Sequence, residues 1–353
     1  MENKDHLLFF GELPGGNIHG ISISNSINLS ILSEKYIVHV IEENGAFKKN
    51  LFSYFRKICL LAANSISLIK KCIQVKYKYF YLVISLSFLG AVKVLTMILF
   101  FRILRFRGKV ILHIHRGDFK EFISRNTVNY IIAILINKLC EKVIFLSEKF
   151  VDPVLKKYTE ISIISNTILI PPPDKNYSRK QNFLYISNYI RNKGIIDLME
   201  VMETLSDKEI VLETYGQFAE NDTTLLMKTY QSAKLKINGP ITSEIEKFAI
   251  LGSAKCLILP SLNEGQPLII LEAMATGTPV IVTRVGDMEG LVGSNYPLLI
   301  DPGDKNALMT AILRVHNMKT NDLISLSDNL SDRFQNLFSF GKHRNAILSV
   351  FSD

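Results

Sequence analysis

Two glutamates in the second half of this 353-residue chain, Glu264 and Glu272, combine a reactive side chain with an informative setting. Glu272 is the only charge in an apolar run from Leu268 to Ala275. An unpaired buried carboxylate is costly, and the two hydroxyls of a ribose would be suitable hydrogen-bond partners for it. Glu264 lies in the loop before that run, where a carboxylate can contact a bound ligand.

The residues around these glutamates predict a strand, a short loop, a helix and a second strand. The unbroken apolar run Cys256-Leu-Ile-Leu259 is typical of a strand buried on both faces of a parallel sheet. Pro267 fits the first position of the helix, Gly277 fits its C′ position, and the second strand begins at Pro279. A diphosphate is stabilised at a helix N-terminus. The amides expected there are those near Gly265, Gln266 and Leu268.

The whole run from Pro260 to Val280 resembles the Glu-x7-Glu signature of the retaining family-4 glycosyltransferases. The Pro-Ser, Glu-Gly-x-Pro and Glu-Ala-Met-Ala-x-Gly-x-Pro-Val-Ile pieces match as well. The resemblance implies the GT-B fold, in which two Rossmann-like doubly wound α/β domains face each other across a cleft. It implies that Glu272 holds the donor ribose and that Glu264 contacts the transferring sugar as a catalytic residue. The alternative is a βαβ unit of another doubly wound protein, with Glu272 paired to a structural Arg.

The segment Phe183-Leu-Tyr-Ile-Ser-Asn-Tyr-Ile-Arg-Asn-Lys-Gly194 resembles the family's strand that is followed by Gly-Arg and then Lys-Gly. In that pattern the Arg and the Lys hold the donor diphosphate. Lys193 matches, whereas Asn188 stands where the family has Arg, so we expect Arg191 to supply the missing cation from the same loop. Gly216, after a later strand, resembles a backbone position that frames the nucleotide. Asp304, in a strand-end turn, is expected to cap a helix.

The first half carries weaker motifs. Gly16, in a Gly-Gly turn after the first strand, resembles the family's turn that lines the cleft; the alternative is a plain turn. The segment His113-Ile-His-Arg-Gly-Asp-Phe119 ends a strand, which is where ligands bind in open α/β sheets. It resembles the family's strand-end histidine motif, and His115 is the expected functional histidine. His113 points to the same side by strand alternation, and a structural role for either ring stays open.

Alternating strand and helix patterns continue through both halves of the chain. Three prolines and a polar tail in Pro171–Lys180 predict a linker, so we expect domains over residues 1–172 and 173–353, with a C-terminal helix that can pack back on the first. The apolar stretch Tyr79–Ile103 is long enough to span a membrane. Its βαβ spacing favours a buried strand and an amphipathic helix instead.

Charge is uneven along the sequence. Residues 1–170 hold 23 Lys and Arg against 12 Asp and Glu, and residues 44–117 hold fourteen basic residues and no acidic one. This indicates an anionic partner, namely membrane lipid, a lipid diphosphate or nucleic acid, and favours the lipid. The alternative is a solvated basic surface that binds nothing in particular. No motif of interleaved basic and aromatic residues supports nucleic-acid binding. Four scattered cysteines and a polar N-terminus that is not a signal peptide indicate the reducing cytoplasm.

The resemblance implies a hexosyltransferase with no cofactor. No Asp-x-Asp occurs for a metal-bridged diphosphate, which agrees with the metal-independent GT-B type. The resemblance implies transfer of a sugar from a nucleoside diphosphate to a lipid-linked glycan acceptor, in bacterial O-antigen or capsule synthesis. The enzyme would then lie on the inner face of the cytoplasmic membrane. The alternatives are a GT-B nucleotide-sugar epimerase or hydrolase, and a non-catalytic nucleotide or nucleic-acid binder.

Overall fold

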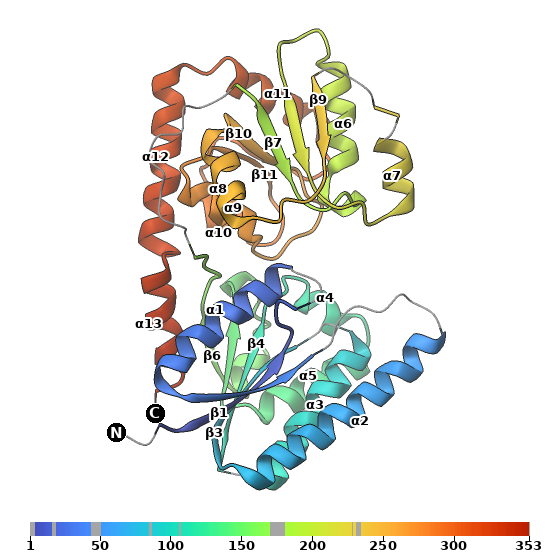
Figure 1. Cartoon of the computed structure of the whole chain (residues 1–353), viewed down its shortest axis with the longest axis vertical. Helices are drawn as coiled ribbons and strands as arrows, with labels where there is room; N and C mark the ends of the chain where they lie inside the picture. The colour runs from blue at the N-terminus through green and yellow to red at the C-terminus, as the bar shows by residue number, and fades with distance from the viewer. Residues whose placement is uncertain are drawn as a thin grey trace. The chain divides into compact units, whose positions relative to one another are not determined.

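A computed structural model describes most of the chain. The described residues are 4–15, 19–43, 51–84, 87–105, 107–169, 181–227, 229–230 and 234–352. They form two compact units (Figure 1). The first unit is Met1–Asn166 with Phe340–Asp353, and the second is Thr167–Ser339. The expected linker Pro171–Lys180, and with it the expected boundary after residue 172, lies outside the described residues.

The first unit is built on a parallel six-stranded sheet in the order β2-β1-β3-β4-β5-β6. Its strands are β1 (His6–Gly11), β2 (Ile37–Glu42), β3 (Tyr77–Val83), β4 (Lys109–Ile114), β5 (Lys142–Phe145) and β6 (Glu160–Ile163). The order reverses between β1 and β3, as in flavodoxin-like sheets. The last of these strands, β6, is short and ends at Ile163.

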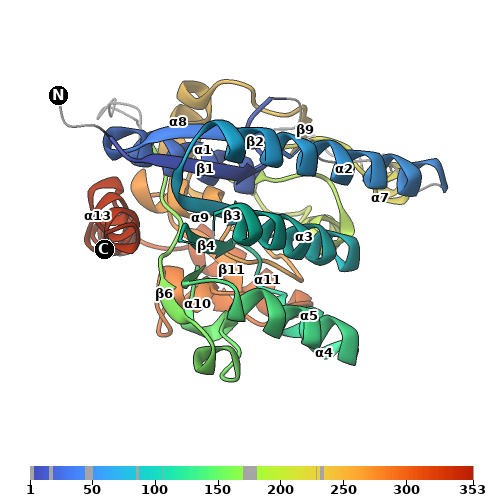
Figure 2. The ribbon, with the colours of Figure 1, turned by 90° about the horizontal axis from the view of Figure 1, so that it is seen from below.

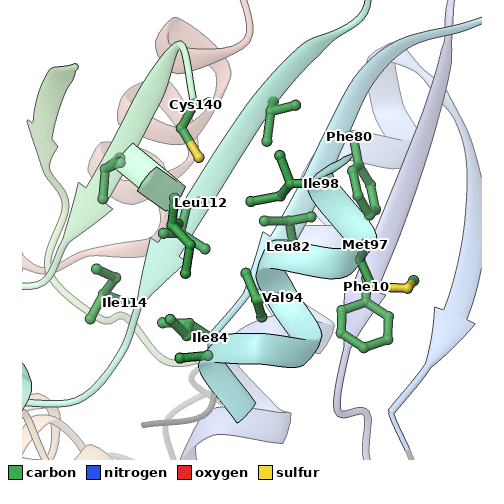
Figure 3. Packing of buried hydrophobic residues seen from close by; sticks show 14 of the residues in the cluster. Phe10, Phe80, Leu82, Ile84, Val94, Met97, Ile98, Leu112, Ile114 and Cys140 are labelled. Atoms are coloured by element: carbon green, nitrogen blue, oxygen red, sulfur yellow. The ribbon is translucent and has the colours of Figure 1, made fainter. Parts of the chain in front are cut away.

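Strand alternation divides the core of the first unit into two layers. Phe9, Tyr81 and Ile111 pack on the face that α1 (Gly20–Lys35) and α13 (Phe340–Val350) cover. The opposite face packs against three helices, which Figure 2 shows side by side: α2 (Leu51–Gln74), α3 (Phe88–Leu104) and α5 (Thr127–Lys138). Figure 3 shows that second core, in which Leu82 and Leu112 of the sheet meet Val94 and Ile98 of α3.

The stretch Tyr79–Ile103 is a buried strand followed by a helix, as its spacing predicts. Among the described residues, no helix is both long and apolar enough to cross a membrane. The prediction of an amphipathic helix is wrong, however. The outer face of α3 carries apolar side chains, and Ile103 is 77% exposed.

The second unit also has a parallel six-stranded sheet, in the order β12-β11-β10-β7-β8-β9. Its strands are β7 (Phe183–Ile186), β8 (Leu212–Tyr215), β9 (Leu235–Asn238), β10 (Cys256–Leu259), β11 (Val280–Thr283) and β12 (Leu299–Ile300). This is the doubly wound Rossmann order, and its switch point lies between β7 and β10. Both strands are almost wholly buried, as their apolar composition predicts.

Helices cover the second sheet in two groups. One contains α8 (Glu244–Ser253), α9 (Leu268–Ala275) and α12 (Thr320–Leu337), and the other contains α6 (Ile195–Thr204), α7 (Asn221–Met227) and α11 (Lys305–His316). The remaining helices are the short α4 (Phe119–Ser124) and α10 (Met288–Val292). Short 3-10 turns span Glu148–Phe150, Leu155–Lys157 and Arg191–Lys193.

Candidate functional site

The loops that follow β7 and β10 meet at the switch point of the second sheet. The backbone N–H of Leu262 donates to the carbonyl oxygen of Asn192 at 2.9 Å. Gly194 has a φ of +71°, and a Cβ there would lie 1.9 Å from the carbonyl oxygen of Pro260. Only glycine allows this close approach. In open α/β sheets, ligands bind outside the carboxyl ends of the strands at such a point.

Lys193 and Glu264 are brought together there. The Lys193 Nζ donates to Glu264 Oε1 at 2.7 Å, and the Ser261 hydroxyl donates to the same oxygen at 2.8 Å. The Glu264 side chain is 7% exposed, whereas that of Lys193 is 26% exposed. The cation therefore presents its outer side to solvent, while the carboxylate is fixed beneath it. An ammonium carries three donors, and Glu264 uses one of them.

The loop from Gly265 to Pro267 is anchored from behind. The Gln266 side chain is buried and its amide nitrogen donates to Asp287 Oδ2 at 2.6 Å. Gly286 has a φ of +54°, and a Cβ there would meet the carbonyl oxygen of Glu264 at 2.4 Å. The loop after β11 thus packs tightly under the loop after β10 and holds the Glu264 backbone in place.

The helix α9 begins at Leu268, so Pro267 is its N-cap residue. The prediction that Pro267 occupies the first helical position is wrong by one residue. Pro267 has an extended ψ of 129°, so the helix starts at the next residue. Gly277 has a φ of +66° just beyond the C-cap Thr276, so its predicted C′ position is confirmed.

Glu272 is buried and is not unpaired. The Lys247 Nζ of α8 donates to Glu272 Oε1 at 2.8 Å and to Glu244 Oε1 at 2.9 Å. Burial raises the pKa of the Glu272 carboxyl, and the charge of Lys247 opposes that rise. Burial alone would lower the pKa of Lys247, but its two carboxylate partners raise it. The sequence argument from an unpaired carboxylate is therefore wrong, because Lys247 is the partner that it missed.

The position of Lys247 in the sequence gives an indication that it can reach Glu272. Ser243 caps α8 by accepting from the N–H of Glu246, and Lys247 lies one turn beyond this cap. The helices that flank β10, α8 and α9, pack side by side. A lysine on the inner side of the first helix can therefore reach the one charge on the second.

The other expected donor residues line the same edge of the sheet. The Asn188 and Arg191 side chains are exposed in the loop after β7. The backbone N–H of Arg191 donates to Glu220 Oε2 at 2.9 Å. A Cβ at Gly216 would lie 2.0 Å from the carbonyl oxygen of Ser187, which ties the loop after β8 to the loop after β7. Asp304 accepts from the N–H of Ala307 at 2.8 Å, so its predicted capping role is confirmed.

In the first unit, His113 and His115 share one side of the end of β4. Their rings stack with centroids 3.8 Å apart and an interplanar angle of 27°. Both are buried, and burial lowers the pKa of both, that of His115 to about 3. The interaction of His115 with Asn166 opposes this trend and acts to raise its pKa. Gly16 lies outside the described residues.

The part of the chain that the structure describes contains no group of three or more His, Cys, Asp or Glu side chains that could hold a metal ion. The site at the switch point instead combines two pairs of an ammonium and a carboxylate, Lys193 with Glu264 and Lys247 with Glu272, and a helix N-terminus. Such a set can bind a diphosphate and hydroxyl groups.

Comparisons by sequence match this chain to glycosyltransferases. Residues 180–318 match the family model described as Glycosyl transferases group 1. The putative teichuronic acid biosynthesis glycosyltransferase TuaC of Bacillus subtilis is 30% identical over 164 residues, which are 46% of this chain and 40% of that protein. The O-antigen chain mannosyltransferase RfbU of Salmonella typhimurium is 25% identical over 202 residues, which are 56% of each. The matches thus span 40% and 56% of these curated relatives.

Comparisons by structure extend over the whole chain. Sucrose-phosphate synthase from Thermosynechococcus elongatus has a TM-score of 0.74 at 17% identity, with 98% of each chain covered. Anabaena HepE in complex with UDP has a TM-score of 0.71 at 15% identity, with 98% of this chain and 99% of that chain covered. Likeness at this identity shows the fold, which is the predicted GT-B fold. Residues 180–318 therefore resemble the group 1 glycosyltransferases, in agreement with the predicted family-4 type, and the predicted GT-B fold is confirmed.

Proposed function

We propose that this chain moves a hexosyl group from a nucleoside-diphosphate sugar to a hydroxyl of a lipid-diphosphate-linked glycan, with retention at the anomeric carbon. The observation that carries the proposal is the Lys193–Glu264 pair at the switch point between β7 and β10. It places a cation and a carboxylate side by side where a Rossmann sheet binds its ligand.

The donor would lie along the carboxyl edge of the second sheet. Lys193 and the amides at the start of α9 face the diphosphate, with Arg191 available from the same loop as Lys193. Glu272 accepts from the ribose hydroxyls while Lys247 keeps its carboxylate paired. The pairing with Lys247 lowers the cost of burying the Glu272 carboxylate.

In the proposed reaction the bond between the anomeric carbon and the diphosphate oxygen breaks, and the diphosphate leaves with the electron pair. The acceptor oxygen bonds to the same face of the anomeric carbon, and its proton passes to the departing diphosphate. Lys193 offsets the negative charge that grows on the leaving group. Glu264, held by Lys193 and Ser261, offsets the positive charge that grows on the sugar.

The names of relatives support the class of acceptor. One is a UDP-Gal:alpha-D-GlcNAc-diphosphoundecaprenol alpha-1,3-galactosyltransferase of Escherichia coli, 33% identical over 105 residues, which are 30% of this chain and 27% of that protein. TuaC and RfbU are named for teichuronic acid and O-antigen synthesis. We infer that this chain also works on a surface polysaccharide, with its acceptor bound by the first unit.

The first unit offers a surface that suits a membrane carrying such an acceptor. Along α2, Ile58, Ile66 and Ile73 are exposed at intervals that place them on one side of the helix. The helices α3 and α5 lie beside α2 in turn (Figure 2). They expose further apolar side chains, among them Ile103 and Ile131. Apolar side chains beside basic ones are the composition of a surface that lies in the headgroup region of an anionic bilayer.

Only part of the basic stretch belongs to that surface. Arg56, Lys57 and Lys70 are exposed on α2. Arg102 instead donates to the carbonyl oxygens of Gly108 and Leu139 and pairs with Glu141, and Arg105 donates to the carbonyl oxygen of Val75. These two arginines fasten the ends of helices, so we assign the electrostatic attraction to the α2 residues.

A transfer assay tests the proposal. The purified chain is incubated with a panel of UDP- and GDP-sugars and with lipid-diphosphate-linked acceptors, and products are followed by mass spectrometry. Proton NMR of the product reads the anomeric configuration. A glycosylated acceptor with the donor's configuration supports the proposal. An inverted product overturns retention, hydrolysis without transfer points to a hydrolase, and an altered sugar on the nucleotide points to an epimerase. Nucleotide or nucleic-acid binding with no turnover of any donor overturns catalysis.

A further inference from the structure

A row of buried polar groups crosses the first unit from its C-terminal helix to the end of β4. His343 of α13 has Nδ1 2.8 Å from the carbonyl oxygen of Ser165 and Nε2 2.7 Å from the Asn28 side-chain atom placed as Oδ1, in α1. The atom placed as Nδ2 of the same amide lies 3.0 Å from the hydroxyl oxygen of Tyr81 in β3. That hydroxyl lies 2.7 Å from Nδ1 of His113. All four side chains are buried.

The first link of the row has only one possible direction. A backbone carbonyl accepts hydrogen bonds and never donates them, so Nδ1 of His343 carries a proton. Burial lowers the pKa of His343 to about 4, and the groups that it contacts, Ser165 and Asn28, are uncharged. The ring is therefore neutral near pH 7, and its other nitrogen, Nε2, is an acceptor.

The remaining directions follow from that acceptor. Asn28 must turn its NH₂ group toward His343, because two acceptors 2.7 Å apart would repel. This exchanges the two amide atoms relative to their placement above; nitrogen and oxygen have the same shape, and their assignment follows from the hydrogen-bond network. The Asn28 oxygen then faces Tyr81, whose hydroxyl donates to it. The oxygen of Tyr81 accepts in turn from Nδ1–H of His113.

We propose that His343 acts through Asn28 and Tyr81 to keep the proton of His113 on Nδ1. His343 is thus a positioning residue, 230 positions along the chain from the ring that it orders. The Nε2 of His113 has no hydrogen-bond partner in the described part of the chain, so the row ends there in a bare acceptor. The ring of His115 stacks on this fixed ring.

The arrangement gives α13 a role beyond packing. Its apolar side chains, Ile347 and Val350, fill the core beside α1, while His343 sets a proton at the carboxyl edge of the sheet. A role for the His113–His115 pair in binding the acceptor rests on the proposed function. The position of the proton does not, and it is measured without any substrate.

Selective ¹⁵N labelling of the seven histidines tests the proposal in the full-length chain. The resonances of His113 are identified by their loss in His113→Gln. The proposal predicts, at pH 7, a protonated Nδ1 and an unprotonated Nε2 for this ring. A proton on Nε2 instead, or a doubly protonated ring, overturns the proposal with the wild-type protein alone.

Variants separate the row from simple packing. His343→Phe keeps a ring but removes both nitrogens, and Tyr81→Phe removes only the hydroxyl. In each variant the proton of His113 should no longer be held on Nδ1. The ¹⁵N resonance of Nδ1 should then lose the shift of a protonated nitrogen. His343→Gln should preserve it, because its amide can donate to Ser165 and accept from Asn28 as the imidazole does. If His113 keeps the same tautomer in Tyr81→Phe, or loses it equally in His343→Gln and His343→Phe, the row does not set the proton.

Discussion

The Nζ of Lys193 lies 2.7 Å from Oε1 of Glu264, across two loops that are 71 residues apart in the sequence. The contact is possible because Gly194 lets the loop after β7 touch Pro260 at the end of β10. A ligand that reaches Lys193 from solvent therefore also reaches a carboxylate whose position is fixed. This pairing is what links the fold of the second unit to the proposed chemistry.

Removing the cation should affect the transition state more than the ground state. Lys193→Ala is expected to lower kcat for sugar transfer by about 100-fold or more, because loss of one group that stabilises developing charge costs about 3 kcal/mol. Lys208→Ala, at an exposed site in the same unit, is the control. The measurement is steady-state transfer at saturating donor. A kcat for Lys193→Ala within twofold of the control contradicts the role given to Lys193.

Substitutions at Glu272 and at Lys247 should have different effects, the first on nucleotide binding and the second on the stability of the fold. Glu272→Ala is expected to weaken nucleotide binding by about 1–3 kcal/mol in calorimetry, since buried hydrogen bonds to hydroxyls are lost. Lys247→Met should instead destabilise the fold by about 3–5 kcal/mol, because it leaves Glu272 buried without its cation. Adding Glu272→Gln to Lys247→Met should recover most of that stability in urea unfolding. Full affinity in a folded Glu272→Ala would rule out the ribose contact.

Membrane binding should depend on α2. Arg56→Gln with Lys70→Gln is expected to weaken binding to anionic vesicles by about 2 kcal/mol, at about 1 kcal/mol per charge. The same two-charge change at Lys208 and Lys319, exposed in the second unit, is the control. Binding should weaken further as salt is raised, since charges are screened over about 8–10 Å near physiological ionic strength. Cosedimentation measures both effects. Equal binding to neutral and anionic vesicles at every salt concentration would refute the electrostatic account.

Acid should destabilise the first unit through its buried histidines. The folded-state pKa of His343 is about 4 and that of His115 is about 3, both lowered by burial from 6.5. Between pH 6.5 and its folded-state pKa, each of these histidines binds more protons in the unfolded chain than in the folded one. The free energy of unfolding therefore falls as the pH falls below about 6.5. Each pKa unit is worth about 1.4 kcal/mol, so His343 contributes up to about 3 kcal/mol across the window.

Urea unfolding from pH 7.5 to pH 4.5 measures this loss. His343→Gln should lose less stability on acidification than the wild type. His19→Gln is a suitable control, because Glu12 raises the pKa of the half-exposed His19 and gives it the opposite sign. If His343→Gln and the wild type lose stability in parallel, His343 is not neutral in the folded state.

Local patterns in the sequence predict the elements of the second unit well. The apolar run of β10, the helix end at Gly277 and the cap at Asp304 each follow from a few adjacent residues. The pairing of Glu272 with Lys247 does not, because it joins two helices on either side of a strand. The apolar outer side of α3 also departs from prediction, since periodicity shows which residues can share a side but not which neighbour leaves that side uncovered.

In the first unit, the strand-end histidines are visible in the sequence but their surroundings are not. Strand alternation places His113 and His115 on the same side. It cannot show that Tyr81 is the neighbour of His113 across β3 and β4, or that His343 reaches Asn28 from the end of the chain. These contacts depend on sheet order and on the return of residues 340–353 to the first unit.

The central claim is that the carboxyl edge of β7 and β10 binds a nucleoside diphosphate through Lys193 without a metal. Calorimetry with UDP and with GDP, in the presence of EDTA, tests it most directly. We predict that the wild type and Lys208→Ala bind one of these nucleotides in EDTA, and that Lys193→Ala binds it at least tenfold more weakly. Equal affinity in Lys193→Ala, or binding that appears only after a divalent cation replaces EDTA, would contradict the account.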